Sequence, residues 1–155
     1  PPLPPTTFSL EIIAMRDLFN HVHPVVAVAP AAATSDNTAW ASGWIDRKGY
    51  ESLTFLLATG TEADADATFA VTIQDADAEN QSDAAAVTDA NLLGTLALAG
   101  FTFADDGEAR KVGYVGNKRY AKITVTPTAN ASAAYLSIIA LLGHPWNGKL
   151  PNPPV

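Results

Sequence analysis

Residues 52–76 read SLTFLLATGTEADADATFAVTIQDA, two β-prone runs joined by a short acidic segment. Each run is bounded by residues that favour turns, and neither shows the period of an amphipathic helix. Similar runs recur at short intervals along the chain. The candidate strands are residues 23–29, 38–47, 52–59, 68–76, 96–104, 110–115, 118–127 and 134–143. About eight short strands without intervening helical segments predict an all-β antiparallel sandwich that is jelly-roll-like.

Two of these strands carry runs, FLLA at 55–58 and SIIALL at 137–142, that are apolar on consecutive residues instead of alternating. In an antiparallel protein this pattern predicts strands that are covered on both faces. One face would meet the core. The other would meet an extended arm or a neighbouring subunit, and the sequence leaves both options open.

A chain of 155 residues is long enough for one domain with its own core. Its net charge of −7 argues against general nucleic-acid binding, which depends on surplus Lys and Arg. The absence of cysteine excludes disulfides and thiolate metal sites. No apolar run approaches the roughly 20 residues that span a bilayer, and PPLPPTTFSL lacks the features of a secretory signal. We therefore expect direct contact with neither nucleic acid nor a membrane.

Both ends of the chain are rich in proline. Proline fixes φ and lacks a backbone N–H, which predicts extended arms outside the sheets. We divide the chain into an N-terminal arm (1–14), a β-sandwich domain (15–145) and a Pro-rich tail (146–155). The arms are either solvated or docked on a neighbour. In the second case the contact residues would be Pro1, Pro2, Pro4, Pro5, Pro151 and Pro153.

The residues that follow the first proline run could extend the ordered part of the chain. Residues 8–19, FSLEIIAMRDLF, place apolar side chains at about one-turn spacing. Thr7 or Ser9 could cap a helix that begins here. A short N-terminal helix is therefore one interpretation of this segment, and a strand is the other.

Positive charge gathers in residues 111–128, KVGYVGNKRYAKITVTPT, which hold four of the nine basic residues. Gly116–Asn117 is typical of a type I′ turn, which would join the flanking strands as a hairpin. Val112 would then lie opposite Ala121. The hairpin would gather the four basic residues Lys111, Lys118, Arg119 and Lys122 into a candidate interface.

An acidic partner for this hairpin exists in the same chain. Residues 49–109 contain twelve Asp or Glu residues and no Lys or Arg. Opposite charges of this kind favour association, and the sequence fits pairing within one chain as well as pairing between copies. A phosphate loop is a poor alternative, because GYVGNK lacks the glycine spacing and the Lys-Ser/Thr pair of such loops.

Other chemistry finds little support in the sequence. DADAENQSD (75–83) alternates acids like a calcium loop, but Asn80 and Ala86 stand where an EF-hand needs Gly and Glu. His21 and His23 lack a third ligand nearby in sequence. There is no GxSxG elbow, and the carboxylates lie in Ala-rich loops without apolar surroundings. We expect no enzyme, no cofactor and no metal.

The tryptophans allow two interpretations. Trp40 and Trp44 would share one side of a single strand, and Trp146 would end the last one. Core packing is the usual role of tryptophan. The alternative is an aromatic platform for a sugar or a partner protein, which places Trp40 and Trp146 among the candidate interface residues.

IDRKGYESLTF (45–55) and KVGYVGNKRYAKITVTP (111–127) are the most specific parts of a wider likeness over residues 15 to 145. In these stretches the chain resembles a family of small proteins encoded in the structural modules of tailed phages and prophages. The resemblance implies a capsid-associated decoration or cement protein of jelly-roll type. Residues 1–14 lie outside it.

These expectations give a ranked set of functions. The first is a structural virion protein on the capsid surface, made in the bacterial host cytoplasm, with the major capsid protein and copies of itself (a dimer or trimer) as partners. A head-fibre base, neck or tail component is the second. A carbohydrate-binding β-sandwich module is the third, and it would use tryptophans and acidic loops.

Overall fold

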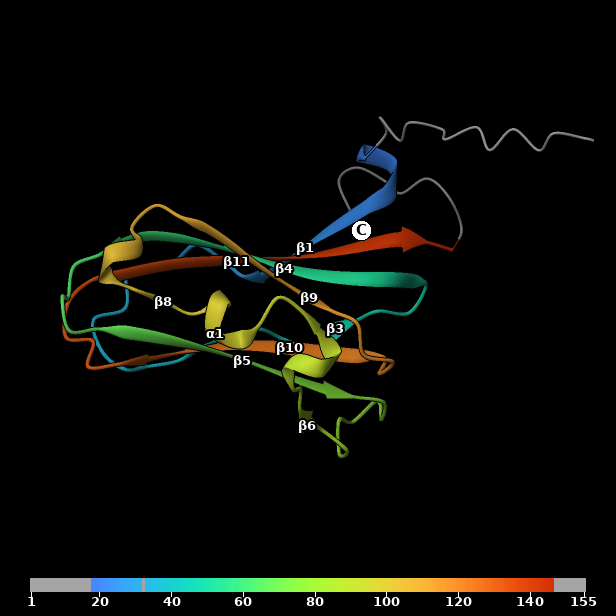
Figure 1. The fold of residues 1–155 in the computed structure, drawn as a ribbon. Coiled ribbons are helices and arrows are strands. Elements are labelled where there is room, and N and C mark those ends of the chain that lie inside the picture. Colours follow the sequence, from blue (N-terminus) through green and yellow to red (C-terminus); the bar gives the residue numbers. More distant parts are fainter. Residues whose placement is uncertain (1–17, 32, 147–155) are drawn as a thin grey trace, which may run out of the picture.

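The computed structural model describes residues 18–31 and 33–146, which form two antiparallel sheets packed face to face (Figure 1). Sheet A contains, in spatial order, β1 (Val22–Val28), β11 (Ala134–Pro145), β4 (Tyr50–Glu62), β9 (Ala109–Tyr114) and β7 (Leu92–Leu93). Sheet B contains β2 (Trp40–Ala41), β10 (Tyr120–Thr128), β5 (Thr68–Ala76) and β6 (Ala85–Ala86), while β3 (Ile45–Asp46) pairs with β10 and β8 (Phe101–Thr102) pairs with β5. The antiparallel β-sandwich predicted from the sequence is therefore confirmed.

The strand order is that of a jelly roll. β2 and β3 pair with successive parts of β10, and β6 and β8 pair with opposite ends of β5, so each couple fills one strand position. The order β1-β11-β4-β9 then faces the order β2/β3-β10-β5-β6/β8, with β7 added at the edge of sheet A. Interleaving of early and late strands in both sheets gives the two Greek keys of this fold.

The core lies between the sheets and is built by alternation along the long strands. In β5 Phe69, Val71 and Ile73 are buried, and the residues between them are exposed. β4 buries Leu53, Phe55 and Leu57 from the opposite sheet. Each such side chain contributes about 1.5–3 kcal/mol when fully buried, so this interface holds the two sheets together.

Two predicted strands are wrong in detail. Residues 96–104 contain α1 (Leu96–Ala99), β8 and the start of η3 (Phe103–Asp105). The Thr95 side chain accepts a hydrogen bond from the Leu98 N–H and caps α1, while Thr102 and Asp105 form a capping box for η3. Local capping thus overrides the apolar run LALAGFTFA.

The predicted strand over residues 38–47 is interrupted between β2 and β3. The Ser42 hydroxyl donates to the Gly43 carbonyl and accepts from the Ile123 N–H of β10. The Ser42 hydroxyl therefore accepts the Ile123 N–H, which a backbone carbonyl would accept if the strand were continuous. Trp40 and Trp44 consequently do not belong to one strand.

The predicted hairpin at Gly116–Asn117 is also wrong. β9 lies in sheet A, where Val112 pairs with Phe55, and β10 lies in sheet B, where Ile123 pairs with Ile73. Residues 115–119 cross from one sheet to the other, and Gly116 does not have the positive φ of a type I′ turn. Lys111 and Lys122 lie in different sheets, so the four basic residues do not gather on one hairpin. Pairing with apolar strands on both sides of the sandwich outweighs the local turn signal.

The remaining helical elements are short. η1 (Phe19–His21) precedes β1, and η2 (Asp89–Asn91) precedes β7. No helix in residues 18–31 and 33–146 is long and apolar enough to cross a membrane. The proline arms and most of the predicted 8–19 helix lie outside the described residues.

Candidate functional site

Two of the basic residues predicted for the interface are neutralised by acids of the same chain. Lys118 Nζ lies 2.9 Å from Asp77 Oδ2 and 3.3 Å from Asp83 Oδ2. Arg119 binds Asp46 through two hydrogen bonds of 2.9 and 2.6 Å. The basic residues of the crossover at 115–119 therefore pair with acids of the same chain. Asp77 and Asp83 belong to the acidic segment 49–109, and Asp46 lies just before it.

The calcium-like sequence DADAENQSD forms a closed loop. Asp83 accepts hydrogen bonds from the backbone N–H groups of Asp77 and Ala78. These bonds, followed by the contact with Lys118, lower the pKa of Asp83 to about 2. Within the described part of the chain no group of three His, Asp or Glu side chains could hold a metal ion. In this loop the carboxylate of Asp83 binds the Lys118 ammonium group and two backbone N–H groups instead of a metal ion.

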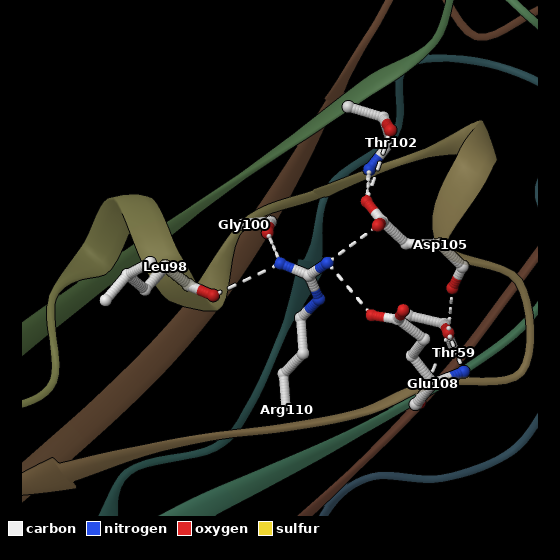
Figure 2. Close-up of polar contacts among 7 residues, drawn as sticks. All are labelled: Thr59, Leu98, Gly100, Thr102, Asp105, Glu108 and Arg110. Atoms are coloured by element: carbon white, nitrogen blue, oxygen red, sulfur yellow. Dashed lines mark hydrogen bonds and ion pairs between the residues drawn. The ribbon is translucent and has the colours of Figure 1, made fainter.

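Arg110, in β9 next to Lys111, fixes two small elements to this strand (Figure 2). Its guanidinium donates to the carbonyls of Leu98 and Gly100, at the end of α1, and lies 2.8 Å from Asp105 Oδ1 and 3.0 Å from Glu108 Oε2. Thr102 donates its N–H to Asp105 and completes the network. Arg110 is therefore a structural residue.

We expect Arg110→Lys to lower the free energy of unfolding by about 1–2 kcal/mol, because lysine keeps the charge but cannot reach two carbonyls and two carboxylates together. Urea denaturation of both proteins measures the loss. Lys111→Ala, a change at the exposed neighbouring position, serves as the control and should shift the midpoint little. An Arg110→Lys midpoint equal to that of wild type would contradict the structural role.

A pocket of about 460 Å³ opens at one end of the sandwich. Four segments meet there: the β3–β4 turn, the start of the loop after β5, the β9–β10 crossover and the residue after β11. Its lining residues are Arg47, Lys48, Tyr50, Glu51, Asp77, Asn117, Lys118, Arg119 and Trp146. We call it the end pocket. It brings together three of the predicted interface residues: Lys118, Arg119 and Trp146.

Arg47 is the most firmly held of the pocket residues that sequence reasoning missed. Its guanidinium donates to the carbonyls of Gly116, Lys118 and Glu51 and stacks over the Tyr114 ring, 4.7 Å from the ring centre. No motif marks it. The only signal was its place in the IDRKGYESLTF stretch, next to Lys48.

The other predicted interface residues lie elsewhere. Trp40 is partly buried and packs on Phe69, with 5.9 Å between the ring centres. Lys122 lies over the Trp44 ring at 6.0 Å. Lys111 lies on the outer side of sheet A, where Leu56 is its partner across the strands.

The outer face of sheet A is apolar. Val26 of β1 pairs with Ile139 of β11, which pairs with Leu56 of β4, so three aliphatic side chains form a row across the sheet. Pro24 and Leu141 form a neighbouring row. Val26 is 64% exposed and Ile139 is 40% exposed. We call these five residues the apolar face.

The outer face of sheet B has the opposite character. The side chains that β5 and β10 turn outward include Thr68, Thr72, Thr124 and Thr126.

Contiguous exposed apolar surface, like the apolar face of sheet A, is unusual on a monomeric soluble protein and marks contact sites. The sequence predicted strands covered on both faces. The structure shows such a surface on sheet A, where Leu56 and Leu141 line a pocket with Leu18 and His21. Val26 and Ile139 remain exposed.

One buried side chain has no role in either surface. Glu62, at the end of β4, is 4% exposed, and its carboxylate oxygens form no well-aligned hydrogen bond with the described residues. Burial, opposed by a contact with the Tyr135 backbone and helped by the Asp106 charge, raises the pKa of Glu62 to about 7. This carboxyl therefore titrates near neutral pH.

Comparison with known proteins gives distant structural likenesses. No protein-family model and no curated protein matches the chain. A structure of infectious bursal disease virus strain Gx has 13% identity and a TM-score of 0.42, and the match covers 96% of this chain and 39% of that one. A family two carbohydrate esterase from Cellvibrio japonicus has 13% identity and a TM-score of 0.31, with 84% and 37% covered.

The VP2 subviral particle of infectious bursal disease virus has 14% identity and a TM-score of 0.29, with 98% and 47% covered. The chain thus spans less than half the length of each of these three proteins. Likenesses this distant assign neither a function nor a partner to the chain.

Proposed function

We propose that this chain is a structural virion protein that binds the outside of a phage capsid and stabilises it as a decoration or cement protein. The single observation that carries the proposal is the apolar face on sheet A, opposite a Thr-rich face on sheet B. Exposure of such a face to water is unfavourable, and the free energy falls when a partner covers it.

The mechanism requires many modest contacts and no reaction. Burial of apolar area contributes about 25 cal/mol per Å² before the costs of association. On a symmetric shell the same contact recurs for each copy, so that small interfaces add up. The partners would be the major capsid protein and neighbouring copies of this chain. The resemblance in IDRKGYESLTF and KVGYVGNKRYAKITVTP supports the same placement.

We expect Ile139→Asp to reduce the number of copies bound per capsid at least tenfold, because a carboxylate in the apolar face must be desolvated on binding. Purified capsids lacking the protein are mixed with each variant, and the bound copies are counted by quantitative gel densitometry against the major capsid protein. Thr126→Asp adds the same charge on the outer face of sheet B and should bind like wild type.

Equal binding of Ile139→Asp and wild type, with both folded by circular dichroism, would contradict attachment through the apolar face. The wild-type copy number separates the two virion functions. A simple ratio to the major capsid protein over the whole shell supports decoration, whereas a few to a few dozen copies would indicate a neck, tail or head-fibre component.

A further inference from the structure

The end pocket, on the loops at one end of the sandwich, has an aromatic wall. Trp146 is 67% exposed, and its backbone N–H donates to the Gly49 carbonyl at 3.0 Å. Tyr50 lies beside it in the fold, since it pairs with Pro145 across the sheet, and its ring is 5.5 Å from that of His23. Two aromatic side chains on anchored backbone thus border one cavity.

The charged wall of the end pocket is fixed by contacts behind it. Arg47 is held by three carbonyls and by the Tyr114 ring. Lys118 and Arg119 are held by Asp77, Asp83 and Asp46. A wall that is ordered before a ligand arrives loses little conformational entropy on binding. Pockets of this size with a few convergent polar groups are the usual form of small-molecule sites.

The balance of charge in the end pocket favours a ligand with a single negative charge. Four cations and the two carboxylates of Glu51 and Asp77 line it, but Lys118 and Arg119 are neutralised by Asp77, Asp83 and Asp46. Arg47 and Lys48 are the lining cations that have no carboxylate partner among the described residues. Lys48 forms no ion pair with the described residues, which leaves its ammonium group available. These two cations lie beside the carboxylate of Glu51, although the whole chain carries −7. A polyphosphate would face the two carboxylates as well, and they would repel it.

Those carboxylates suit a ligand that is rich in hydroxyl groups, because an ionised carboxylate only accepts hydrogen bonds and a hydroxyl can donate them. Asn117 adds an amide that both donates and accepts. The exposed indole of Trp146 offers a flat apolar surface on which the C–H face of a sugar ring can pack. A cation, hydroxyl acceptors and an aromatic plane together describe an acidic sugar.

We propose that the end pocket binds a uronic acid unit of an acidic glycan. The sugar carboxylate pairs with Lys48, its ring packs on Trp146, and its hydroxyls donate to Glu51 or Asp77. This site is separate from the apolar face and does not depend on attachment to a capsid. Its failure and that of the proposed function are therefore distinguishable.

The test is isothermal titration calorimetry of the full chain with trisaccharides of galacturonic, glucuronic and mannuronic acid, and with neutral galactotriose as the uncharged control. We expect at least one acidic trimer to bind tenfold or more tightly than the neutral one. Trp146→Ala should weaken that binding at least tenfold. Lys48→Gln should remove the preference for the acidic trimer. Lys122→Gln, which removes a cation outside the pocket, should leave both affinities unchanged.

The proposal would be overturned by saturable binding of none of the acidic trimers, by equal affinity for acidic and neutral trimers, or by full affinity in the Trp146→Ala variant. Because Trp146 is exposed at the end of β11, its replacement should leave the fold intact, which circular dichroism verifies. Loss of binding on Lys122→Gln would also overturn it, since the contact would then be nonspecific charge attraction.

Discussion

Gly116→Ala should lower the free energy of unfolding by about 2–3 kcal/mol, as expected for a group forced into a filled space. A Cβ at this position would lie 2.5 Å from Cζ of Tyr114 and would also meet its hydroxyl oxygen. The Tyr114 ring cannot move aside, because it is 2% exposed and has the Arg47 guanidinium over its face. Gly116 is thus required for space, whereas the sequence suggested a turn with positive φ.

The Tyr114 hydroxyl would lose its partners if the ring moved. It donates to Asp75 Oδ2 at 2.7 Å and accepts from the Lys118 N–H at 3.2 Å. Burial raises the pKa of Tyr114 above its ordinary value, so the hydroxyl keeps its proton and remains a donor at neutral pH. Movement of the ring would therefore disturb the link between β9, β5 and the crossover.

Equilibrium unfolding in urea measures this loss, and Gly43→Ala is the matched control. A Cβ on Gly43 meets no atom within 4 Å, so this variant should change the free energy of unfolding by less than about 0.5 kcal/mol. If Gly116→Ala were as stable as Gly43→Ala, the packing described here around Tyr114 would be wrong.

Glu62→Gln should stabilise the protein at pH 8 by up to about 3 kcal/mol. The raised pKa of Glu62, about 7 against an ordinary value of 4.5, means that the folded protein holds a proton which the unfolded chain releases. The difference corresponds to about 3 kcal/mol. Glutamine has nearly the shape of the protonated carboxyl and never ionises.

The sign of the pH dependence follows from linkage. Between pH 4.5 and 7 the folded state binds more protons at Glu62 than the unfolded state, so stability falls as pH rises through this range. Above pH 7 the full penalty of the buried charge is present. Acidification from pH 8 to pH 5 should therefore stabilise wild type, and Glu62→Gln should remove most of this change.

Urea denaturation at half-unit steps between pH 5 and pH 8 tests the assignment. Glu79→Gln alters an exposed acid and should leave the pH profile as in wild type. A Glu62→Gln profile with the wild-type slope would show that another group titrates in this window. Asp46, Asp77 and Asp83 do not contribute to the profile between pH 5 and pH 8. Their pKa values are lowered in the folded protein, so these carboxyls are ionised in both the folded and the unfolded state throughout that range.

The sequence predicted the fold class well, because alternating or continuous apolar runs bounded by turn residues depend on local chemistry alone. The strand over residues 68–76 was placed correctly to the residue. The strand over residues 96–104 was wrong because of local capping, whereas the errors over residues 38–47 and 115–119 arose where a distant contact decides the structure. Gly116–Asn117 has the composition of a turn, but the partners of the flanking strands are Phe55 and Ile73, far away in the chain.

The candidate sites show the same division. The sequence singled out Lys118, Arg119 and Trp146, which the fold brings to one pocket. It could not show that Asp46, Asp77 and Asp83 would neutralise two of these cations, since ion pairs depend on tertiary distances. Arg47 and Glu62 were missed for a related reason. The carbonyl contacts of Arg47 and the raised pKa of Glu62 depend on burial in the fold, and nothing in their neighbouring residues signals that burial.

The unlike outer faces of the two sheets give the molecule a polarity. A copy that lay flat on a surface through sheet A would present the threonines of sheet B away from that surface. The end pocket opens on the loops at one end of the sandwich, so it would face sideways. Attachment would then set the direction in which every copy displays its loops, and a shell of such copies would carry an ordered array of identical pockets that open along the surface.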